Sequence, residues 1–171
     1  MGGKIRFNVA KFGAKVASQV SKFGFGSGNN LPGYVFYKIA GKEALKDLAH
    51  EMSIGPILIT GTNGKTTTTT LLIKLLSADT KIRKSFESNT IHAITTGILK
   101  GDGDLGVFEY GIRNKSYGIP DTVQRLIDPV GVVYTTISRE HSQVAGVKNP
   151  FEEYVDAKSL LSQGMTRGVV I

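Results

Sequence analysis

The sequence predicts an α/β protein in which helices flank a parallel β-sheet. Three observations indicate this fold class. Short apolar segments rich in strand formers alternate along the chain with longer segments of helical periodicity. The links between these segments are short, as in repeated βαβ units. A glycine-rich turn at 61–64 joins the first of the strands to the helix that follows it.

The alternation begins with an apolar segment at 56–60, which is too short for a helix and is therefore predicted as a buried strand. The later predicted elements are helix 65–76, strand 82–87, helix 90–100, strand 105–110, helix 120–127, strand 130–137, helix 151–163 and a strand beginning in the final GVVI. Asn149 and Pro150 are expected as cap and first-turn residues of the helix at 151–163. A buried parallel strand is a poor place for a natural chain end, so a fragment of a longer protein is expected.

The N-terminal part predicts an amphipathic, basic helix at 4–23, because apolar residues recur there every three or four positions. These residues are Ile5, Val9, Phe12, Val16, Val20 and Phe23. Such a helix docks on its own or a partner domain, or it lies on a membrane surface. A glycine-rich break at 24–34 and a helix near 41–52 follow. We therefore expect a helical and glycine-rich segment, 1–54, followed by the α/β domain, 55–171.

Composition narrows the class of protein. The 171 residues include 40% hydrophobic residues and 21 glycines, which fits a folded chain, and the lack of cysteine excludes disulfides and thiolate metal sites. No apolar run approaches the roughly 18 residues of a membrane span, and the N-terminus has no signal-peptide core. A cytoplasmic location is expected. The net charge is +7, but residues 1–50 hold eight Lys and Arg against two acids, so a nucleic-acid partner is not expected.

The turn after the first strand has the features of a phosphate-binding loop. Backbone N–H groups at the start of a helix converge on one point, and the helix dipole favours negative charge there. Gly61 and Gly64 allow backbone angles that other residues avoid. Lys65 can neutralise phosphate charge, and the hydroxyl of Thr66 can bind Mg²⁺. A lone Gly-Lys-Thr occurs by chance, but the strand before it and the helix after it favour a nucleotide site.

The spacing Gly-Thr-Asn-Gly-Lys-Thr-Thr resembles the ATP loop of the Mur ligase family. This family includes the bacterial cell-wall peptide ligases, folylpolyglutamate synthetase and the archaeal pseudomurein ligases. Its first glycine stands three places before the second, so Ile59, at the usual P-loop glycine position, belongs to the strand. The resemblance covers about residues 27–171 and implies that ATP and Mg²⁺ bind here. The implied ATP-binding residues are Gly61, Thr62, Asn63, Gly64, Lys65, Thr66 and Thr67.

Two further positions match landmarks of that family. Glu109, in Phe-Glu-Tyr-Gly-Ile, matches a Glu-x-Gly-Ile pattern whose glutamate helps to hold Mg²⁺. An acid at the end of a parallel strand lies where ligands bind, although it could instead cap the following turn. His141 matches the family histidine after the next strand, while Thr136 replaces the usual asparagine. The resemblance implies a metal-binding role for His141; a surface histidine in a loop is the alternative.

Lys158 matches a lysine that is carbamylated in many members, where the resulting anion and His141 hold a second Mg²⁺. The residues support this independently, since Phe151, Tyr154, Val155 and Leu161 share a helical face with Lys158. Burial lowers the pKa of a lysine and leaves more neutral amine to react with CO₂. A lysine that snorkels from the helix rim is the alternative.

Ser88 and Asn89 open a helix and resemble the family segment beside the γ-phosphate and the acceptor substrate. The resemblance as a whole implies an ADP-forming amide ligase that joins carboxylate and amine substrates through an acyl phosphate. Lys65, Glu109, His141 and Lys158 are the implied catalytic residues. Synthesis of a pseudomurein or peptidoglycan precursor is the implied pathway.

The N-terminal Gly-Asn-Asn-Leu-Pro-Gly looks more like the archaeal pseudomurein ligases and the lipid II amidating subunit, which takes ammonia from a glutaminase partner. Family members close a C-terminal domain over the site, so residues 1–171 alone are not expected to ligate. Two other classes remain open. One is a nucleotide-binding regulatory or assembly module without turnover, and the other is a membrane- or partner-docking protein led by the helix at 4–23.

Overall fold

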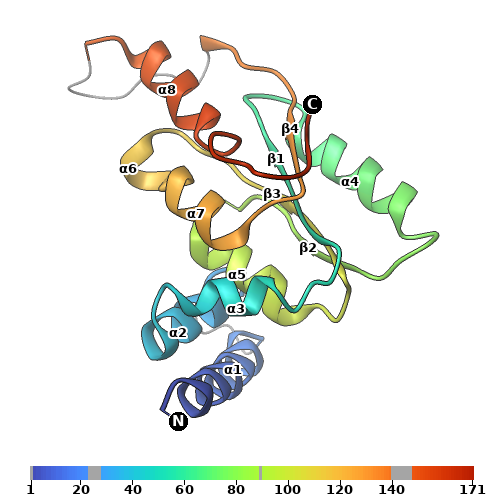
Figure 1. Cartoon of the computed structure of the whole chain (residues 1–171), viewed down its shortest axis with the longest axis vertical. Coiled ribbons are helices and arrows are strands. Elements are labelled where there is room, and N and C mark those ends of the chain that lie inside the picture. The colour runs from blue at the N-terminus through green and yellow to red at the C-terminus, as the bar shows by residue number, and fades with distance from the viewer. Residues whose placement is uncertain (1, 23–27, 89, 140–147) are drawn as a thin grey trace.

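A parallel sheet forms the centre of the molecule (Figure 1). The computed structural model describes residues 2–22, 28–88, 90–139 and 148–171. Within these ranges one sheet has the strand order β2-β3-β1-β4-β5, and every pairing is parallel. The strands are β1 (Gly55–Thr60), β2 (Ile82–Ser85), β3 (Leu105–Glu109), β4 (Gly131–Tyr134) and β5 (Val169–Val170). The predicted fold class is confirmed.

Helices cover both faces of this sheet. Helix α4 (Lys65–Leu76) lies on one face, while α5 (Ile91–Lys100), α7 (Pro120–Ile127) and α8 (Pro150–Ser159) lie on the other (Figure 1). The chain passes from β1 outward to β2 and then returns through β3 toward β4 and β5. Right-handed crossovers in opposite directions place their helices on opposite faces, which explains this division. A short helix, α6 (Lys115–Gly118), precedes α7.

Each face of the sheet has its own apolar core, because successive strand residues point to opposite sides. On the α4 side, Ile59 of β1 packs with Ile73 and residues of β3. On the other side, Leu58 belongs to a larger core shared by the sheet, the helices that cover this face and the N-terminal helices. This larger core therefore contains residues of both the N-terminal segment, 1–54, and the α/β domain, 55–171.

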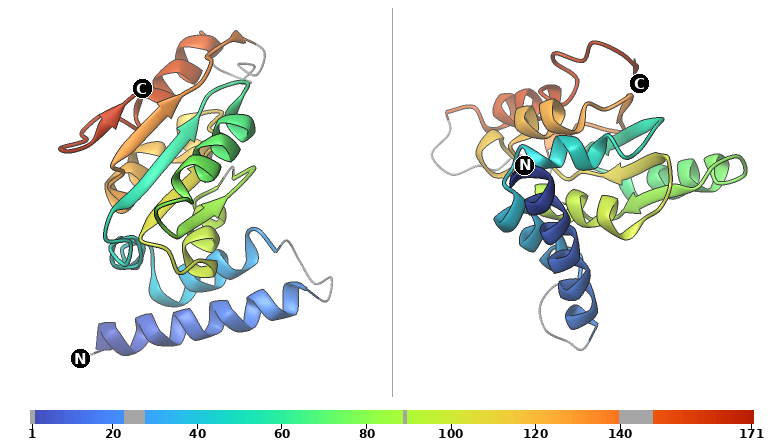
Figure 2. Two further views of the ribbon diagram at one scale, coloured as in Figure 1. Left: turned by 90° about the vertical axis from the view of Figure 1, so that its right-hand side faces the viewer. Right: turned by 60° about the horizontal axis from the view of Figure 1, so that its bottom comes forward.

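The N-terminal helices pack below α5, at the end of the molecule away from the carboxyl ends of the strands (Figures 1 and 2). They are α1 (Gly2–Ser21), α2 (Leu31–Ala40) and α3 (Ala44–Ala49). The expectation of a break as far as residue 34 is wrong in its last four residues, because α2 begins at Leu31. Pro32 fits the first turn of a helix, where its missing N–H costs nothing. The N–H of Gly33 donates to the Thr96 hydroxyl of α5 at 2.9 Å, so this glycine serves close packing between helices.

Helix α1 packs on the domain through a face of small residues. Ala10, Ala14 and Ala17 are buried, and the ring of Phe7 meets that of Phe36 edge-on at 5.5 Å between centroids. The apolar residues from Ile5 to Val20 that identified this helix in the sequence are exposed, and Phe23 lies outside the described residues. Docking on the protein's own domain is therefore observed, but apart from Phe7 the large apolar residues of α1 take no part in it.

Several boundaries differ from those expected. Strand β4 ends at Tyr134 rather than 137, and α8 ends at Ser159 rather than 163. Asn149 occupies the N-cap position of α8 with Pro150 in the first turn, yet the Asn149 side chain makes no capping hydrogen bond. In the described part of the chain, no helix combines the length and apolarity needed to cross a membrane.

The packing of α1 leads to a prediction about stability. Replacing Ala10 by Leu should lower the free energy of unfolding by about 1–3 kcal/mol, because the added atoms overfill a closely packed contact. Replacing Phe12 by Ala should change it by less than about 0.5 kcal/mol, because the ring is exposed. Urea denaturation followed by circular dichroism measures both values. A larger loss for Phe12→Ala than for Ala10→Leu would contradict the assignment of the packed face.

Candidate functional site

The glycine-rich loop lies where three strands end side by side. Strand β1 ends at Thr60 and α4 begins at Lys65. Strand β1 lies between β3 and β4, and the connection after β1 leaves toward β2, whereas the connections after β3 and β4 leave toward β5. In open α/β sheets, ligands bind at the carboxyl ends of the strands at such a point. The fold therefore places the loop where a ligand site is expected.

Backbone geometry explains both glycines of the loop. Gly61 has φ +147°, and a Cβ there would lie 2.0 Å from the Thr135 hydroxyl oxygen. Gly64 has φ +82° and is the N-cap of α4. A residue with a side chain would be strained at either position. The spacing of three between them thus follows from a turn that must close tightly against the end of β4 and then open a helix.

The residues after β4 hold this loop in place. The Thr62 N–H donates to the Thr136 carbonyl at 2.5 Å, and the Asn63 N–H donates to the Thr136 hydroxyl at 3.1 Å. The Thr135 hydroxyl donates to the Asn63 carbonyl at 2.6 Å. Thr136, which stands where the family has asparagine, thus binds the loop through both its backbone and its side chain.

A second set of contacts joins the loop to α8. The Thr62 hydroxyl lies 2.9 Å from the Tyr154 hydroxyl and accepts the Ser138 N–H at 2.9 Å. Sequence reasoning assigned no role in the site to Thr135, Ser138 or Tyr154. The position of Thr135 directly after a predicted parallel strand was the available signal; Tyr154 could not be found this way, because its contact depends on how α8 packs.

Two residues predicted to hold Mg²⁺ lie in contact. The Thr66 hydroxyl donates to Glu109 Oε2 at 2.9 Å. Glu109 is 4% exposed and is paired in register with Ile59, so the end of β3 brings its carboxylate beside the first turn of α4. Lys65 reaches back over the loop, and its amine donates to the Thr62 carbonyl at 2.8 Å. The structure therefore brings Lys65, Thr66 and Glu109 together around the loop.

This pair of oxygen ligands fits Mg²⁺. A carboxylate and a hydroxyl are hard oxygen donors, and Mg²⁺ at phosphate sites takes only one or two protein ligands beside water and phosphate oxygens. Among the described residues, no group of three or more His, Cys, Asp or Glu side chains could hold a metal by itself. A metal shared with a phosphate ligand is thus the arrangement that these residues suit.

Lys158 is fully buried at the base of the loop. Its amine donates to the Gly61 carbonyl at 3.1 Å, the Ile112 carbonyl at 3.0 Å and the Thr60 hydroxyl at 3.3 Å. It also lies 4.4 Å from the centre of the Tyr154 ring. Burial, and then the positive charge of Lys65, lower the pKa of Lys158 to about 7. The predicted burial is seen, whereas a snorkelling position is not.

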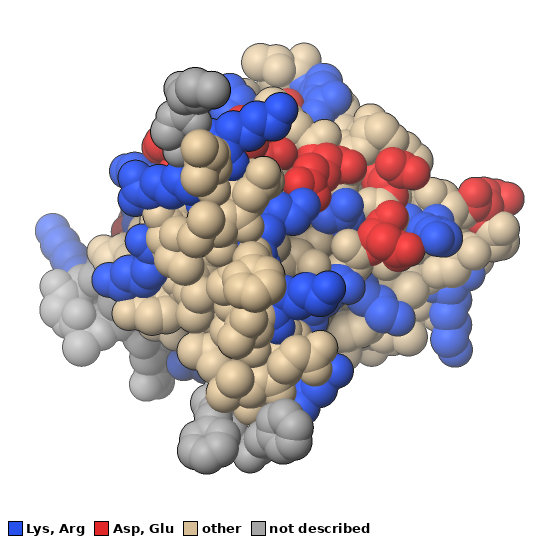
Figure 3. Space-filling view, turned by 90° about the horizontal axis from the view of Figure 1, so that it is seen from below, with Lys and Arg blue, Asp and Glu red and all other residues tan. Residues whose placement is uncertain are grey.

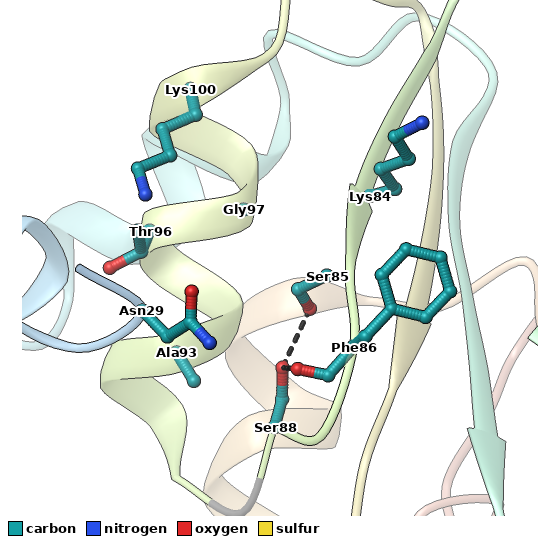
Figure 4. A pocket seen from close by; sticks show the side chains of 9 residues that line it. All are labelled: Asn29, Lys84, Ser85, Phe86, Ser88, Ala93, Thr96, Gly97 and Lys100. Atoms are coloured by element: carbon teal, nitrogen blue, oxygen red, sulfur yellow. Dashed lines mark hydrogen bonds between the residues drawn. The ribbon is translucent and has the colours of Figure 1, made fainter. Parts of the chain in front are cut away.

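Of the other predicted site residues, Ser88 and Thr67 lie in the described part of the chain, and two others do not. Ser88 is buried, and its hydroxyl donates to the Ser85 hydroxyl at 2.7 Å, at the side of a hollow of about 250 Å³ between β2 and α5 (Figure 4). Its carbonyl accepts the Gly111 N–H at 2.8 Å, which links it to the segment after β3. Thr67 is exposed in the first turn of α4. Asn89 and His141 lie outside the described residues.

The titration of Lys158 predicts how stability depends on pH. The folded pKa is about 7, whereas an unfolded lysine titrates near 10.4. Between these values the unfolded chain holds a proton that the folded chain has released, so the free energy of unfolding should rise with pH by a few kcal/mol. The variant Lys158→Met should lack this rise. Urea denaturation of both proteins at several pH values, in buffer free of CO₂, measures the difference; parallel curves would contradict the buried, low-pKa amine.

Comparisons with known proteins bear on the family and the fold. Residues 59–171 match the model of the Mur ligase middle domain. Two relatives are UDP-N-acetylmuramoyl-tripeptide--D-alanyl-D-alanine ligases. The enzyme of Borreliella burgdorferi is 36% identical over 100 residues, which cover 56% of this chain and 21% of that enzyme. The enzyme of Bacillus subtilis is 29% identical over 136 residues, which cover 75% of this chain and 29% of that enzyme.

Solved structures share the fold. MurF from Acinetobacter baumannii superposes with a TM-score of 0.62 at 18% identity, covering 82% of this chain and 29% of that protein. MurF ligase from Thermotoga maritima in complex with ADP gives a TM-score of 0.55 at 20% identity, covering 71% and 29%. The chain thus spans less than a third of the length of these relatives. Since the family model covers more than half of the chain, this protein belongs to the Mur ligase family.

Proposed function

We propose that the complete protein forms an amide bond at the expense of ATP, releasing ADP, on a precursor of the cell wall. The observation that carries this proposal is the contact between Thr66 and Glu109 at the mouth of a phosphate loop. It supplies two oxygen ligands for Mg²⁺ where the N–H groups of α4 would meet the phosphates of ATP. The two curated relatives are named as ligases of a UDP-linked muramoyl tripeptide, which supports a substrate of the same chemical kind.

The reaction proceeds in two steps. A carboxylate oxygen of the first substrate bonds to the γ-phosphorus of ATP, and the bond from that phosphorus to the bridging oxygen breaks, releasing ADP. The amine nitrogen of the second substrate then bonds to the acyl carbon, inorganic phosphate leaves, and the nitrogen loses a proton. Mg²⁺ supplies positive charge that offsets the charge of the transferring group.

The residues of the loop have separate roles in this proposal. The N–H groups from Gly64 to Thr67 bind phosphate oxygens, whereas those of Thr62 and Asn63 donate to Thr136 and hold the loop. Lys65 turns its amine from the Thr62 carbonyl to the β- and γ-phosphates. Thr66 and Glu109 orient the metal. Ser88 and Asn89 border the acceptor substrate. Preorganised donors of this kind are effective because they need no rearrangement when charge develops.

His141 and Lys158 are proposed to hold a second metal once Lys158 is carbamylated. The low pKa supports the reaction of the amine with CO₂, since a neutral amine is the reactive form. The contacts of the Lys158 amine restrict where carbamylation can take place. Two of the three polar neighbours of the amine are carbonyl oxygens, which suit an ammonium or amine and would repel the oxygens of a carbamate, while the Thr60 hydroxyl can donate as well as accept. Carbamylation therefore requires the side chain to leave this position.

The finer assignment within the family is also a proposal. The N-terminal Gly-Asn-Asn-Leu-Pro-Gly supports either a pseudomurein peptide ligase or a lipid II amidating subunit that receives ammonia from a glutaminase. A nucleotide-binding module without turnover is the competing function, because a phosphate loop binds nucleotide whether or not ligation follows. Formation of ADP and of an amide by the complete protein distinguishes the two.

A lysine variant tests the ligase proposal. In the complete protein, Lys65→Ala should lower formation of the acyl phosphate by about a hundredfold or more, because a cation beside the transferring phosphoryl group is lost. Trapping of the acyl phosphate with hydroxylamine and release of ADP measure the step. Lys74→Ala, an exposed lysine on the same helix, is the matched control and should keep full activity. Equal turnover by both variants would exclude this role for the loop.

Carbamylation is tested by spectroscopy. Incubated with carbon-13-labelled bicarbonate near neutral pH, the wild-type protein should show a carbamate resonance. Lys158→Arg should lack that resonance, because a guanidinium stays protonated and does not react. Lys74→Arg should keep it. A wild-type spectrum without the resonance would leave Lys158 as a buried cation that supports the loop, and not as a metal ligand.

A further inference from the structure

Helix α1 exposes a continuous apolar stripe. Five large apolar side chains recur at spacings of three and four on the side of the helix away from α2. They are Ile5 (64% exposed), Val9 (52%), Phe12 (70%), Val16 (46%) and Val20 (42%). Single exposed apolar residues are ordinary, but a stripe that runs the length of a helix marks a surface that binds something.

The fold does not use this stripe for packing. Helix α1 is held on α2 and α5 by its alanine face, by the Phe7 ring and by the Arg6 guanidinium, which donates to the Ile39 carbonyl. The amine of Lys11 also pairs with Glu51 at 2.6 Å. The helix is therefore held to the domain from one side, and the opposite side is free to meet a second surface.

Basic residues border the stripe. Helix α1 contains no Asp or Glu. At 100° per residue, Lys4, Lys11 and Lys15 fall along one side of the stripe and Arg6 falls on the other. Figure 3 shows this face of the molecule, where Lys and Arg lie on both sides of a band of uncharged atoms. An apolar band bordered by cations is complementary to apolar lipid chains beneath negatively charged head groups.

We propose that α1 lies along the surface of a membrane that contains anionic lipids. The stripe enters the boundary between head groups and acyl chains, and Lys4 and Lys15 extend to the phosphates of the head groups. The helix lies in the surface and does not cross it, in agreement with the lack of a spanning helix among the described residues. The phosphate loop is at the opposite end of the molecule, so binding through α1 leaves it open to solvent (Figures 1 and 2).

Vesicle co-sedimentation of the complete protein tests this proposal. The wild type should bind vesicles made of equal parts phosphatidylglycerol and phosphatidylcholine, and should bind pure phosphatidylcholine far less. Phe12→Glu should lower the partition coefficient roughly tenfold or more, because one buried aromatic side chain is lost. Leu75→Glu is the matched control: Leu75 is 71% exposed on α4, outside this stripe, and the change adds the same charge. It should bind as the wild type does.

Two variants that each remove one lysine test the role of the basic residues beside the stripe. Lys15→Gln should lower binding to the anionic vesicles roughly fivefold, the effect of one basic residue near such a surface. Lys74→Gln on α4 should leave binding unchanged. Added salt should weaken the wild-type interaction, because exposed charges are screened. Thermal unfolding of each variant shows that the fold is kept, which is expected because these side chains are exposed.

Several results would overturn the proposal. They are a wild type that does not sediment with anionic vesicles, equal binding to neutral vesicles, or equal effects of Phe12→Glu and Leu75→Glu. A protein interface would show itself differently. Light scattering would then detect an oligomer or a complex in the wild type that dissociates in Phe12→Glu. The wild type would not bind vesicles. None of these measurements depends on nucleotide, so the outcome is separate from that of the ligase assay.

Discussion

A single buried amine joins the segments that meet beneath the phosphate loop. Lys158 of α8 binds the last residue of β1, the first residue of the loop and the segment after β3. Burying an amine is costly unless it is hydrogen-bonded, and here three acceptors match its three possible hydrogens. The shape of the loop therefore depends on how α8 packs, and Tyr154 of the same helix adds a contact to Thr62.

The carboxyl end of the sheet and the end that carries α1 are packed differently. At the carboxyl end of the sheet, glycines and short hydroxyl side chains allow backbones to approach closely around the loop. At the other end, alanines let α1 sit close to α2, and the five large apolar residues of its stripe remain outside. Close packing of small residues thus serves both ends, in one case to shape a site and in the other to leave a surface available.

Much of the fold could be predicted because the periodic signals are local. Helix α4 begins and ends at the residues expected, Lys65 and Leu76, since its leucines and the glycine before it mark the limits clearly. Helix α2 was missed because Pro32 and Gly33 are usual signs of a turn. Here the proline fits a first turn and the glycine meets α5, and neither fact can be known without the partner helix.

The sequence by itself determined the loop, the strand before it and the basic character of the N-terminal helix. Each of these rests on neighbouring residues: backbone angles that only glycine tolerates, a short apolar run, or charges along one helix. Only the tertiary structure decided that Thr66 touches Glu109, that Lys158 faces three acceptors, and that the apolar stripe of α1 points outward. Those contacts join residues far apart in the chain, and they depend on strand order and helix packing, which local patterns do not specify.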